Sequence, residues 1–325
     1  MTEAIASRSA VGQFVAGVPQ HERMPSRPIR IIGKVRKRLW QLAYLCLHPV
    51  AHFRCVVAVR PSGGRHNWLV SSKYLGDYLA LSMPLPQRMS ALIAHYQMIS
   101  AKVRPSHAEA LADGVVIWSK DLQGGLPPLR IHLEPSRLAP MEGELQLRFS
   151  FRSDLFIFTF SFGTGAPFNI PARDILFIGG AQGALGSRLE MREASRLNDE
   201  ISPASMLMMA VRALANAVNV EDLIAVCPDE QISQSYCPDG IRLDYHQYWS
   251  DAGGSRQGDH YHLPVEPVPK PLSEIPLTHR ARTRRKREAK ERLRASIAKH
   301  VGLIFRSGCL ADARETPLSP SVVVR

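Results

Sequence analysis

Apolar and polar residues alternate most regularly in the middle of the chain. At 144–151 every second residue is apolar, and at 156–162 every even-numbered residue is a phenylalanine. A period of two is that of a strand with one buried face, so these segments predict two half-buried strands paired as an antiparallel hairpin. Apolar runs at 115–118 and 129–133 predict two more strands before the hairpin.

Helical periodicity appears on both sides of this region. At 87–103 apolar residues recur every three or four positions, which predicts a helix with one buried face. The segment 204–218 is apolar nearly all round and follows Ser202-Pro203, so we expect a buried helix that starts there. Because it lies between apolar strands at 174–178 and 223–227, it predicts a βαβ unit. Together, the predicted hairpin, βαβ unit and helices indicate an α+β fold with a mixed central sheet and packed helices.

A glycine-rich segment comes directly after the strand at 174–178. It contains Gly179, Gly180, Gln182 and Gly183. Three glycines in five residues indicate unusual backbone dihedral angles or the close approach of another group. Loops at the ends of buried strands are common ligand sites, so we interpret these four residues as a ligand-binding loop.

The net charge of +12 comes from two segments. Residues 23–38 hold seven cations and no acid, and 280–294 hold nine cations and two acids. Helices are predicted at 29–47, which includes the later part of the first segment, and at 280–294. They are either solvated basic faces or contacts to a polyanion. Because 280–294 has no aromatic residue for base stacking, an anionic membrane surface is favoured over nucleic acid, and the anion-binding candidates are Arg284, Arg285, Lys286 and Arg287.

Charge and composition divide the chain into three parts. We expect a basic, partly disordered N-terminal arm at 1–60, an α+β core domain at 61–278, and a basic helix with a disordered tail at 279–325. Five scattered cysteines without a C-x-x-C pair indicate neither a disulfide framework nor a zinc site. Asp259, His260 and His262 lack a third ligand at useful spacing, so no metal is expected. No signal peptide or membrane span is predicted, which favours a cytoplasmic protein, with peripheral binding to the inner membrane as the alternative.

Several short segments along the chain carry a family resemblance. They are 73–75, Arg88, His95-Tyr96, 159–162, 178–183, 245–254, Leu263-Pro264 and 280–287. Together they resemble the VirK/YbjX family (DUF535) of bacterial proteins over about residues 65–295, and the chain departs from the family pattern at 200–203 and 227–229. The resemblance implies an association with virulence and with tolerance of cationic antimicrobial peptides, and no settled biochemical activity.

The predicted order of elements is also similar to that of GNAT-type acyltransferases. In that fold, backbone N–H groups after the fourth strand, with the helix that follows, hold the pyrophosphate of an acyl-CoA. The glycine-rich segment would have this role here. No cofactor is certain from the residues themselves, and acyl-CoA is the candidate. About twenty residues separate the glycines from the buried helix, whereas the GNAT fold usually enters its helix directly. This spacing argues against a pyrophosphate site formed by the glycines and that helix together.

Whether the chain is an enzyme stays open at this point. For acyl transfer, Tyr245 or Tyr248 would be the acid for a leaving thiolate, and Glu144 or His95 the base. Trp249, which precedes Gly253-Gly254, is a further ligand-binding candidate. Core packing is the alternative role for both tyrosines and for His95. The second class of function is a non-enzymatic accessory protein that docks through its basic arms on an anionic membrane or nucleic acid. The oligomeric state is not indicated.

Overall fold

A single sheet organises the part of the chain that the structure describes. This structure is a computed structural model, and it describes residues 27–60, 68–168, 170, 173–236 and 243–306. The strands lie in the order β1-β2-β3-β4-β5-β6-β8-β7. Their bounds are β1 (Val115–Lys120), β2 (Leu129–Pro135), β3 (Leu145–Ser150), β4 (Asp154–Thr164), β5 (Asp174–Gly183), β6 (Asp222–Val226), β7 (Ser255–Gln257) and β8 (His260–Pro264).

Strand directions confirm the α+β fold with a mixed sheet. β3 and β4 form the antiparallel hairpin, with Leu147 opposite Phe158. β5 and β6 are parallel, and the helix α8 (Pro203–Ala217) connects them, as the βαβ prediction requires. The side chain of Ser202 accepts a hydrogen bond from the backbone N–H of Ser205, which is the predicted N-cap. All other neighbouring strands run antiparallel.

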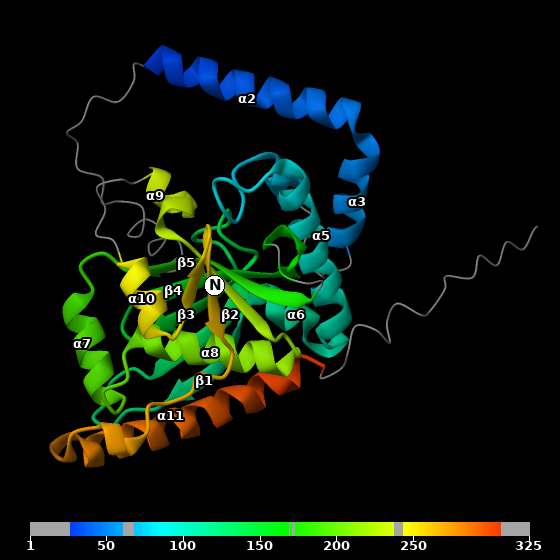
Figure 1. The fold of residues 1–325 in the computed structure, drawn as a ribbon. Coiled ribbons are helices and arrows are strands. Elements are labelled where there is room, and N and C mark those ends of the chain that lie inside the picture. The colour runs from blue at the N-terminus through cyan, green and yellow to red at the C-terminus, as the bar shows by residue number, and fades with distance from the viewer. Residues whose placement is uncertain (1–26, 61–67, 169, 171–172, 237–242, 307–325) are drawn as a thin grey trace, which may run out of the picture.

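Helices cover both faces of this sheet (Figure 1). α8 and α11 lie on one side, and α2, α3, α5 and α9 lie on the other. The remaining helices are α2 (Arg27–Leu47), α3 (Pro49–Val59), α4 (Trp68–Ser71), α5 (Leu85–Lys102), α6 (Pro105–Asp113), α7 (Arg188–Leu197), α9 (Ile232–Tyr236), α10 (Tyr245–Asp251) and α11 (Leu277–Ile304), with short 3₁₀ turns η2 (Lys73–Leu75), η3 (Ala166–Phe168), η4 (Pro228–Glu230) and η5 (Leu272–Glu274).

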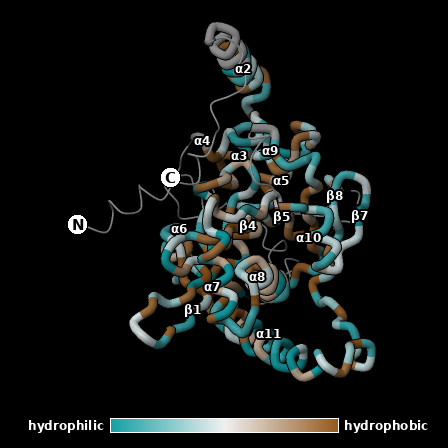
Figure 2. Tube along the Cα trace, turned by 90° about the vertical axis from the view of Figure 1, so that its left-hand side faces the viewer, coloured by the Kyte–Doolittle hydropathy of each residue, from teal (hydrophilic) through white to brown (hydrophobic). Residues whose placement is uncertain are grey.

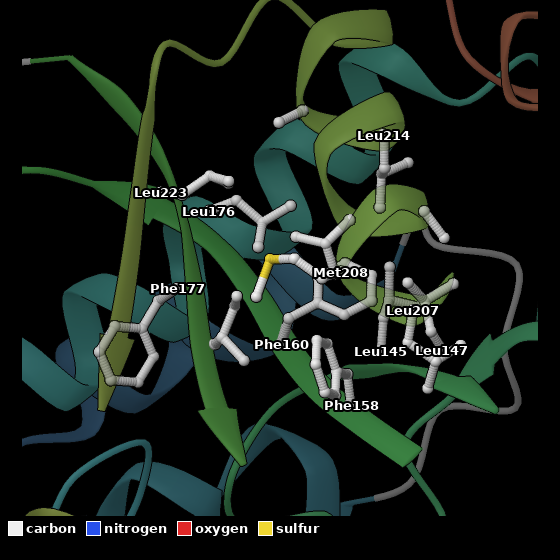
Figure 3. Close-up of a cluster of buried hydrophobic side chains, with 14 of the residues drawn as sticks. Leu145, Leu147, Phe158, Phe160, Leu176, Phe177, Leu207, Met208, Leu214 and Leu223 are labelled. Carbon is white, nitrogen blue, oxygen red and sulfur yellow. The ribbon is translucent and has the colours of Figure 1, made fainter. Parts of the chain in front are cut away.

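The face of the sheet under α8 is apolar. Leu145 and Leu147 of β3 and Phe158 and Phe160 of β4 point from the sheet toward α8, where Leu207 and Met208 meet them (Figure 3). These side chains are all buried. Dense apolar packing of this kind is the main source of stability in a folded domain.

The opposite face of the sheet is polar, yet it is buried as well. Glu134, Glu144, Gln146, Thr159 and Ser161 are each less than 9% exposed. The prediction that β3 and β4 would be half-buried is therefore wrong, because α5 and the chain before β3 cover their polar side chains. Buried polar groups require partners, and the Glu134 carboxylate accepts hydrogen bonds from Gln146 Nε2 (2.7 Å) and Arg148 Nε (2.7 Å).

The two predicted basic helices are packed very differently. α11 packs against α8 and β1 through a buried apolar side that includes Leu293, Ile297 and Val301. α2 stands away from the rest of the molecule at the top of Figure 1 and is joined to it through α3. The segments 1–26 and 307–325 lie outside the described residues, and the three-part division of the chain stays a prediction.

Candidate functional site

The glycine-rich segment continues β5 and does not form a loop. Ile178 pairs with Phe160 and Gly180 pairs with Thr159, so Gly179 is the extra residue of a β-bulge. The strand ends only at Gly183. The prediction of a loop at 179–183 is therefore wrong. A bulge kinks a strand and interrupts its pairing, which explains why this segment departs from a regular strand pattern.

Close approach explains the two central glycines. A Cβ atom on Gly179 would lie 1.9 Å from the backbone oxygen of Glu142, and one on Gly180 would lie 2.0 Å from Glu142 Oε2. Neither glycine has a positive φ angle. Glycine is thus required here because any side chain would collide with Glu142, and the bulge and Glu142 form one structural unit.

Glu142 is a buried carboxylate with a full set of partners. Its residue is 2% exposed. Oε1 accepts a hydrogen bond from the Ser233 backbone N–H (2.9 Å), and Oε2 accepts from Gln182 Nε2 (3.0 Å) and lies 3.4 Å from Thr159 Oγ1. Burial raises the pKa of Glu142, and the hydrogen bonds only partly offset it. A carboxylate whose pKa is raised in this way is suited to accepting and releasing a proton.

The two parallel strands stop pairing beside this carboxylate. The last β5–β6 pair is Ile178 with Ala225, and β5 continues beyond it. There the hydroxyl of Tyr245 accepts a hydrogen bond from the Ala181 N–H and donates one to the Ala181 carbonyl, each at 2.8 Å. Burial, followed by the charge of Glu142, raises the pKa of Tyr245 well above its usual value, so its hydroxyl stays protonated.

Glu144 lies two residues further along, on the same face. Lys73 Nζ is 3.0 Å and 3.1 Å from its two oxygens, and the hydroxyl of Tyr96 donates to Oε2 at 2.6 Å. Burial raises the pKa of Glu144, but the Lys73 charge, the nearby His95 and the Tyr96 hydrogen bond outweigh it and hold the pKa below its usual value. Glu144 is therefore an ionised, paired carboxylate.

His95 packs beside this pair as a neutral ring. Its Nδ1 accepts a hydrogen bond from the Phe162 N–H (3.1 Å), and the ring stacks on Phe162 at 5.8 Å. Burial lowers the pKa of His95 to about 4. This geometry matches the alternative of a hydrogen-bonded packing residue, and a catalytic role for His95 stays a prediction.

The pKa values of Glu142 and Glu144 are thus shifted in opposite directions although only Gly143 separates the two residues. A pair of carboxyl groups whose surroundings shift their pKa values in opposite directions is the usual arrangement for dividing acid–base roles. Of the two, Glu142 has the raised pKa, which favours it over Glu144 as the group that would take up a proton.

A cavity of about 520 Å³ opens on the same polar face. Its walls include Phe177 of β5, two residues before Gly179 in the chain. They also include Glu230, three residues before Ser233. Phe168 stacks on Phe177 with 5.0 Å between ring centres. The cavity lies at the carboxyl end of β6, where ligands of open α/β sheets commonly bind, and its lining residues do not include Glu142 or the residues that bond to it.

The structure separates the remaining site candidates. Tyr248 donates its hydroxyl to the Ala204 carbonyl (3.0 Å), and Trp249 donates Nε1–H to the Val226 carbonyl (3.0 Å). Both rings pack edge-on against Phe158, on the apolar side of the sheet. The predicted residues that do come together around Glu142 are Gly179, Gly180, Gln182 and Tyr245. Gly183 is exposed at the end of β5.

The anion-binding candidates lie on α11, far along the chain from this site. Arg284 and Arg285 are exposed, and Lys286 and Arg287 are partly buried, with Arg287 bonded to the Lys270 carbonyl. Among the described residues no group of three or more His, Cys, Asp or Glu side chains could hold a metal ion.

Sequence reasoning missed the central residue, Glu142, and did not identify Ser233 as its partner or Lys73 and Tyr96 as partners of Glu144. These partners are remote in the chain, so no local pattern indicates them. One signal was present: a glycine separates the two glutamates, and a Cβ on Gly143 would lie 2.6 Å from the Phe160 nitrogen. A glycine inside a strand pattern is typical of a close backbone approach.

Comparisons with known proteins give a family and no activity. Two solved structures of mutants of a cAMP-binding acyltransferase from Mycobacterium smegmatis are similar to this chain, at 10% and 11% sequence identity and TM-scores of 0.27 and 0.24. The alignments cover 65% and 67% of this chain, and 60% and 63% of the acyltransferase chains. The uncharacterized protein YbjX of Escherichia coli is 31% identical over 130 residues, which are 38% of this chain and 39% of YbjX. The chain thus aligns with well under half the length of that relative. Residues 64–299 match the family described as protein of unknown function (DUF535), and the chain belongs to that family.

Proposed function

We propose that this protein transfers an acyl group from an acyl-CoA-type thioester to an acceptor bound in the polar-face cavity. The observation that carries the proposal is the Glu142 unit. A buried carboxylate with a raised pKa is built into a glycine bulge where the parallel strands β5 and β6 separate. The cavity at the carboxyl end of β6 supplies room for an acceptor.

The thioester would bind along the edge of β5 beyond Ile178. Extended ligands bind to open strand edges through backbone hydrogen bonds. On this edge of β5 the backbone N–H and carbonyl of Ala181 form hydrogen bonds with the Tyr245 hydroxyl and, among the described residues, with no neighbouring strand on that side. Amide groups of the ligand would replace Tyr245 at Ala181 and release its hydroxyl.

The proposed reaction then needs one proton acceptor and one donor. Glu142 takes the proton from the acceptor's amine or hydroxyl, whose nitrogen or oxygen attacks the thioester carbonyl carbon. The carbon–sulfur bond breaks, and the released Tyr245 hydroxyl protonates the thiolate. The proton on Glu142 returns to Tyr245 through solvent, so the products are the acylated acceptor and free thiol.

Ligand binding is the first test of this function. Thermal unfolding of the full chain is followed with acetyl-CoA, a long-chain acyl-CoA and ATP, which carries phosphates but no thioester. A ligand at 100 times its Kd stabilises the folded state by about 2.7 kcal/mol, which shifts Tm by several degrees. No shift with either acyl-CoA at millimolar concentration would overturn the proposal.

The role of Glu142 is tested separately by Glu142→Gln. This substitution keeps the size of the side chain and removes its capacity to accept a proton. We expect thiol release from acyl-CoA to fall by about 10²–10⁴-fold while the ligand-induced rise in Tm is retained. Unchanged turnover in Glu142→Gln would exclude Glu142 as the base.

The family resemblance suggests a setting for this activity. We propose that the acylation contributes to tolerance of cationic antimicrobial peptides. A strain lacking the protein is complemented with the wild-type chain or with Glu142→Gln, and survival with such a peptide is measured. Full rescue by Glu142→Gln would favour the non-enzymatic accessory role instead.

A further inference from the structure

The helix pair α2–α3 exposes an unusual amount of apolar surface. Seven large apolar side chains among the described residues of this pair are at least half exposed. They are Val35, Leu39, Leu42, Leu47, Val50, Phe53 and Val57. Trp40 adds to them at 49% exposed. We refer to these eight residues as the apolar stripe. Elsewhere in the described residues large exposed apolar side chains are scattered, and single ones are ordinary on protein surfaces.

Helical spacing puts most of the stripe on one side of each helix. Val35, Leu39 and Leu42 follow each other at steps of four and three along α2. On α3, Val50, Phe53 and Val57 have the same spacing, while Cys55 and Val59 are buried on the side toward α5. α3 is therefore already packed against the body, and its stripe is a second apolar side that the described residues leave uncovered.

The charge around the stripe has a single sign. No aspartate or glutamate occurs between Arg23 and Gly76. Arg36 and Arg38 on α2 and Arg54 on α3 are exposed beside the stripe. A helix with an apolar side, flanking cations and a tryptophan is typical of segments that lie in the interface of an anionic bilayer.

The geometry does not suit a helix that crosses a membrane. Among the described helices none alone is long and apolar enough to span a bilayer. The segments Arg38–Leu47 and Pro49–Val59 reach the length and composition together, but they meet at an angle of 96°. An L-shaped pair of this kind can lay α2, about 30 Å long, flat on a surface while α3 connects it to the core (Figures 1 and 2).

We propose that α2 and the exposed side of α3 form an interfacial anchor that binds anionic lipid bilayers. The apolar stripe inserts at the level of the headgroups, and the cations contact lipid phosphates. This inference is independent of the proposed acyl transfer. It assigns the binding to α2–α3 and not to α11, whose apolar side is already packed against α8 and β1.

Co-sedimentation with vesicles tests the anchor, using the full chain. Vesicles of phosphatidylcholine alone are compared with vesicles containing one quarter phosphatidylglycerol. We expect at least tenfold stronger binding to the anionic vesicles, and a shift of Trp40 fluorescence to shorter wavelength that is lost in Trp40→Phe. Equal binding to both vesicles, or no binding to either, would overturn the proposal.

Matched variants locate the surface. The triple variant Leu39→Ser, Leu42→Ser and Phe53→Ser should lose at least tenfold in binding, with thermal unfolding unchanged because all three side chains are exposed. The control Leu185→Ser with Leu189→Ser changes exposed apolar residues elsewhere and should bind as wild type. Arg36→Glu with Arg38→Glu should weaken binding, whereas Arg284→Glu with Arg285→Glu on α11 should not.

Light scattering after size exclusion separates lipid from a protein partner. If the stripe instead joins two copies of this chain, the wild type will be a dimer that the triple serine variant converts to monomer, and vesicle binding will not depend on the stripe. That result would overturn the lipid anchor. A monomer whose vesicle binding depends on the stripe supports it.

Discussion

The two faces of the sheet are equally buried and are held together by different forces. On the face toward α8, the buried apolar side chains of Leu147, Phe158 and Met208 pack together (Figure 3). On the other face Glu134, Glu142 and Glu144 are buried as well, each with its own set of donors. The apolar face gains stability from area alone, whereas the polar face is stable only while every carboxylate keeps its partners.

The contrast between the two faces indicates where a functional site can lie. Placing three carboxylates inside a domain contributes little or nothing to stability compared with apolar side chains of the same volume. Stability therefore explains the residues of the apolar face, whereas the buried carboxylates of the polar face indicate a functional role. Substitutions that measure the two faces separately test that distinction.

The largest expected effect belongs to the apolar face. Phe158→Ala removes a fully buried ring that contacts Tyr248 and Trp249. Deleting a buried phenylalanine side chain typically costs about 3–5 kcal/mol, and we expect about 4 kcal/mol in the free energy of unfolding, measured with urea. Leu189→Ala, at a residue 77% exposed, should stay within about 0.5 kcal/mol. A loss of less than 1 kcal/mol for Phe158→Ala would contradict the account of this face.

A slightly smaller loss is expected when the Lys73–Glu144 pair is broken. Lys73→Met leaves the Glu144 carboxylate buried without its ammonium partner, and we expect about 3 kcal/mol lower stability at pH 7. The double variant Lys73→Met with Glu144→Gln removes both charges and should recover most of the loss. If the double variant is no more stable than Lys73→Met, the pair does not act as a charge pair.

The pH dependence of this pair has a definite sign. The pKa of Glu144 in the folded state lies below its usual value of 4.5. Its stabilising contribution is therefore present above pH 4.5 and is lost as pH falls through the folded-state pKa. The difference in stability between wild type and Glu144→Gln should shrink on acidification.

The bulge gives the next effect in size. In Gly179→Ala the new methyl group would lie 1.9 Å from the Glu142 backbone oxygen, so the backbone must move. Overpacking of this kind costs about 1–3 kcal/mol, and we expect about 2 kcal/mol. In the control Gly183→Ala the nearest atom is 3.4 Å away, on the Phe156 ring, which is close to ordinary contact. Equal losses in the two variants would show that the contact with Glu142 is not the reason for Gly179.

The apolar half of this fold was predictable from the sequence, and the polar half was not. Periods of two and of 3.6 predicted the β3–β4 hairpin, α5, α8 and the βαβ unit, because each apolar residue faces the core whatever lies opposite. The same reasoning placed Glu144 and Gln146 on a half-buried strand. Their burial depends on α5 and on Lys73, which is 71 residues away in the chain, and no local pattern contains that information.

The glycines show the same limit at the candidate site. Three glycines after an apolar strand indicated correctly that something approaches the backbone closely. The sequence could not say that the approaching group is Glu142 of the same chain, nor that the segment remains a strand with a bulge at Gly179. Tyr245 was selected among the candidates, and its position at Ala181 depends on the tertiary fold alone.

The smallest expected change in stability belongs to Glu142, and its sign separates it from Glu144. Because the folded-state pKa of Glu142 is raised, the ionised form is disfavoured by folding, and wild-type stability should rise as pH falls through that pKa toward 4.5. Glu142→Gln lacks this contribution and replaces one acceptor oxygen by an NH₂ group, which removes at least one of the hydrogen bonds to Glu142, so it should be less stable than wild type by about 1 kcal/mol at pH 7. Unfolding measured at several pH values from about 3 to 8 should show wild type gaining in stability relative to Glu142→Gln as pH falls toward 4.5, and losing its advantage over Glu144→Gln below pH 4.5. Two glutamates on one face with opposite pH slopes would identify Glu142 as the group poised for proton transfer; parallel slopes would remove the reason for choosing it over Glu144.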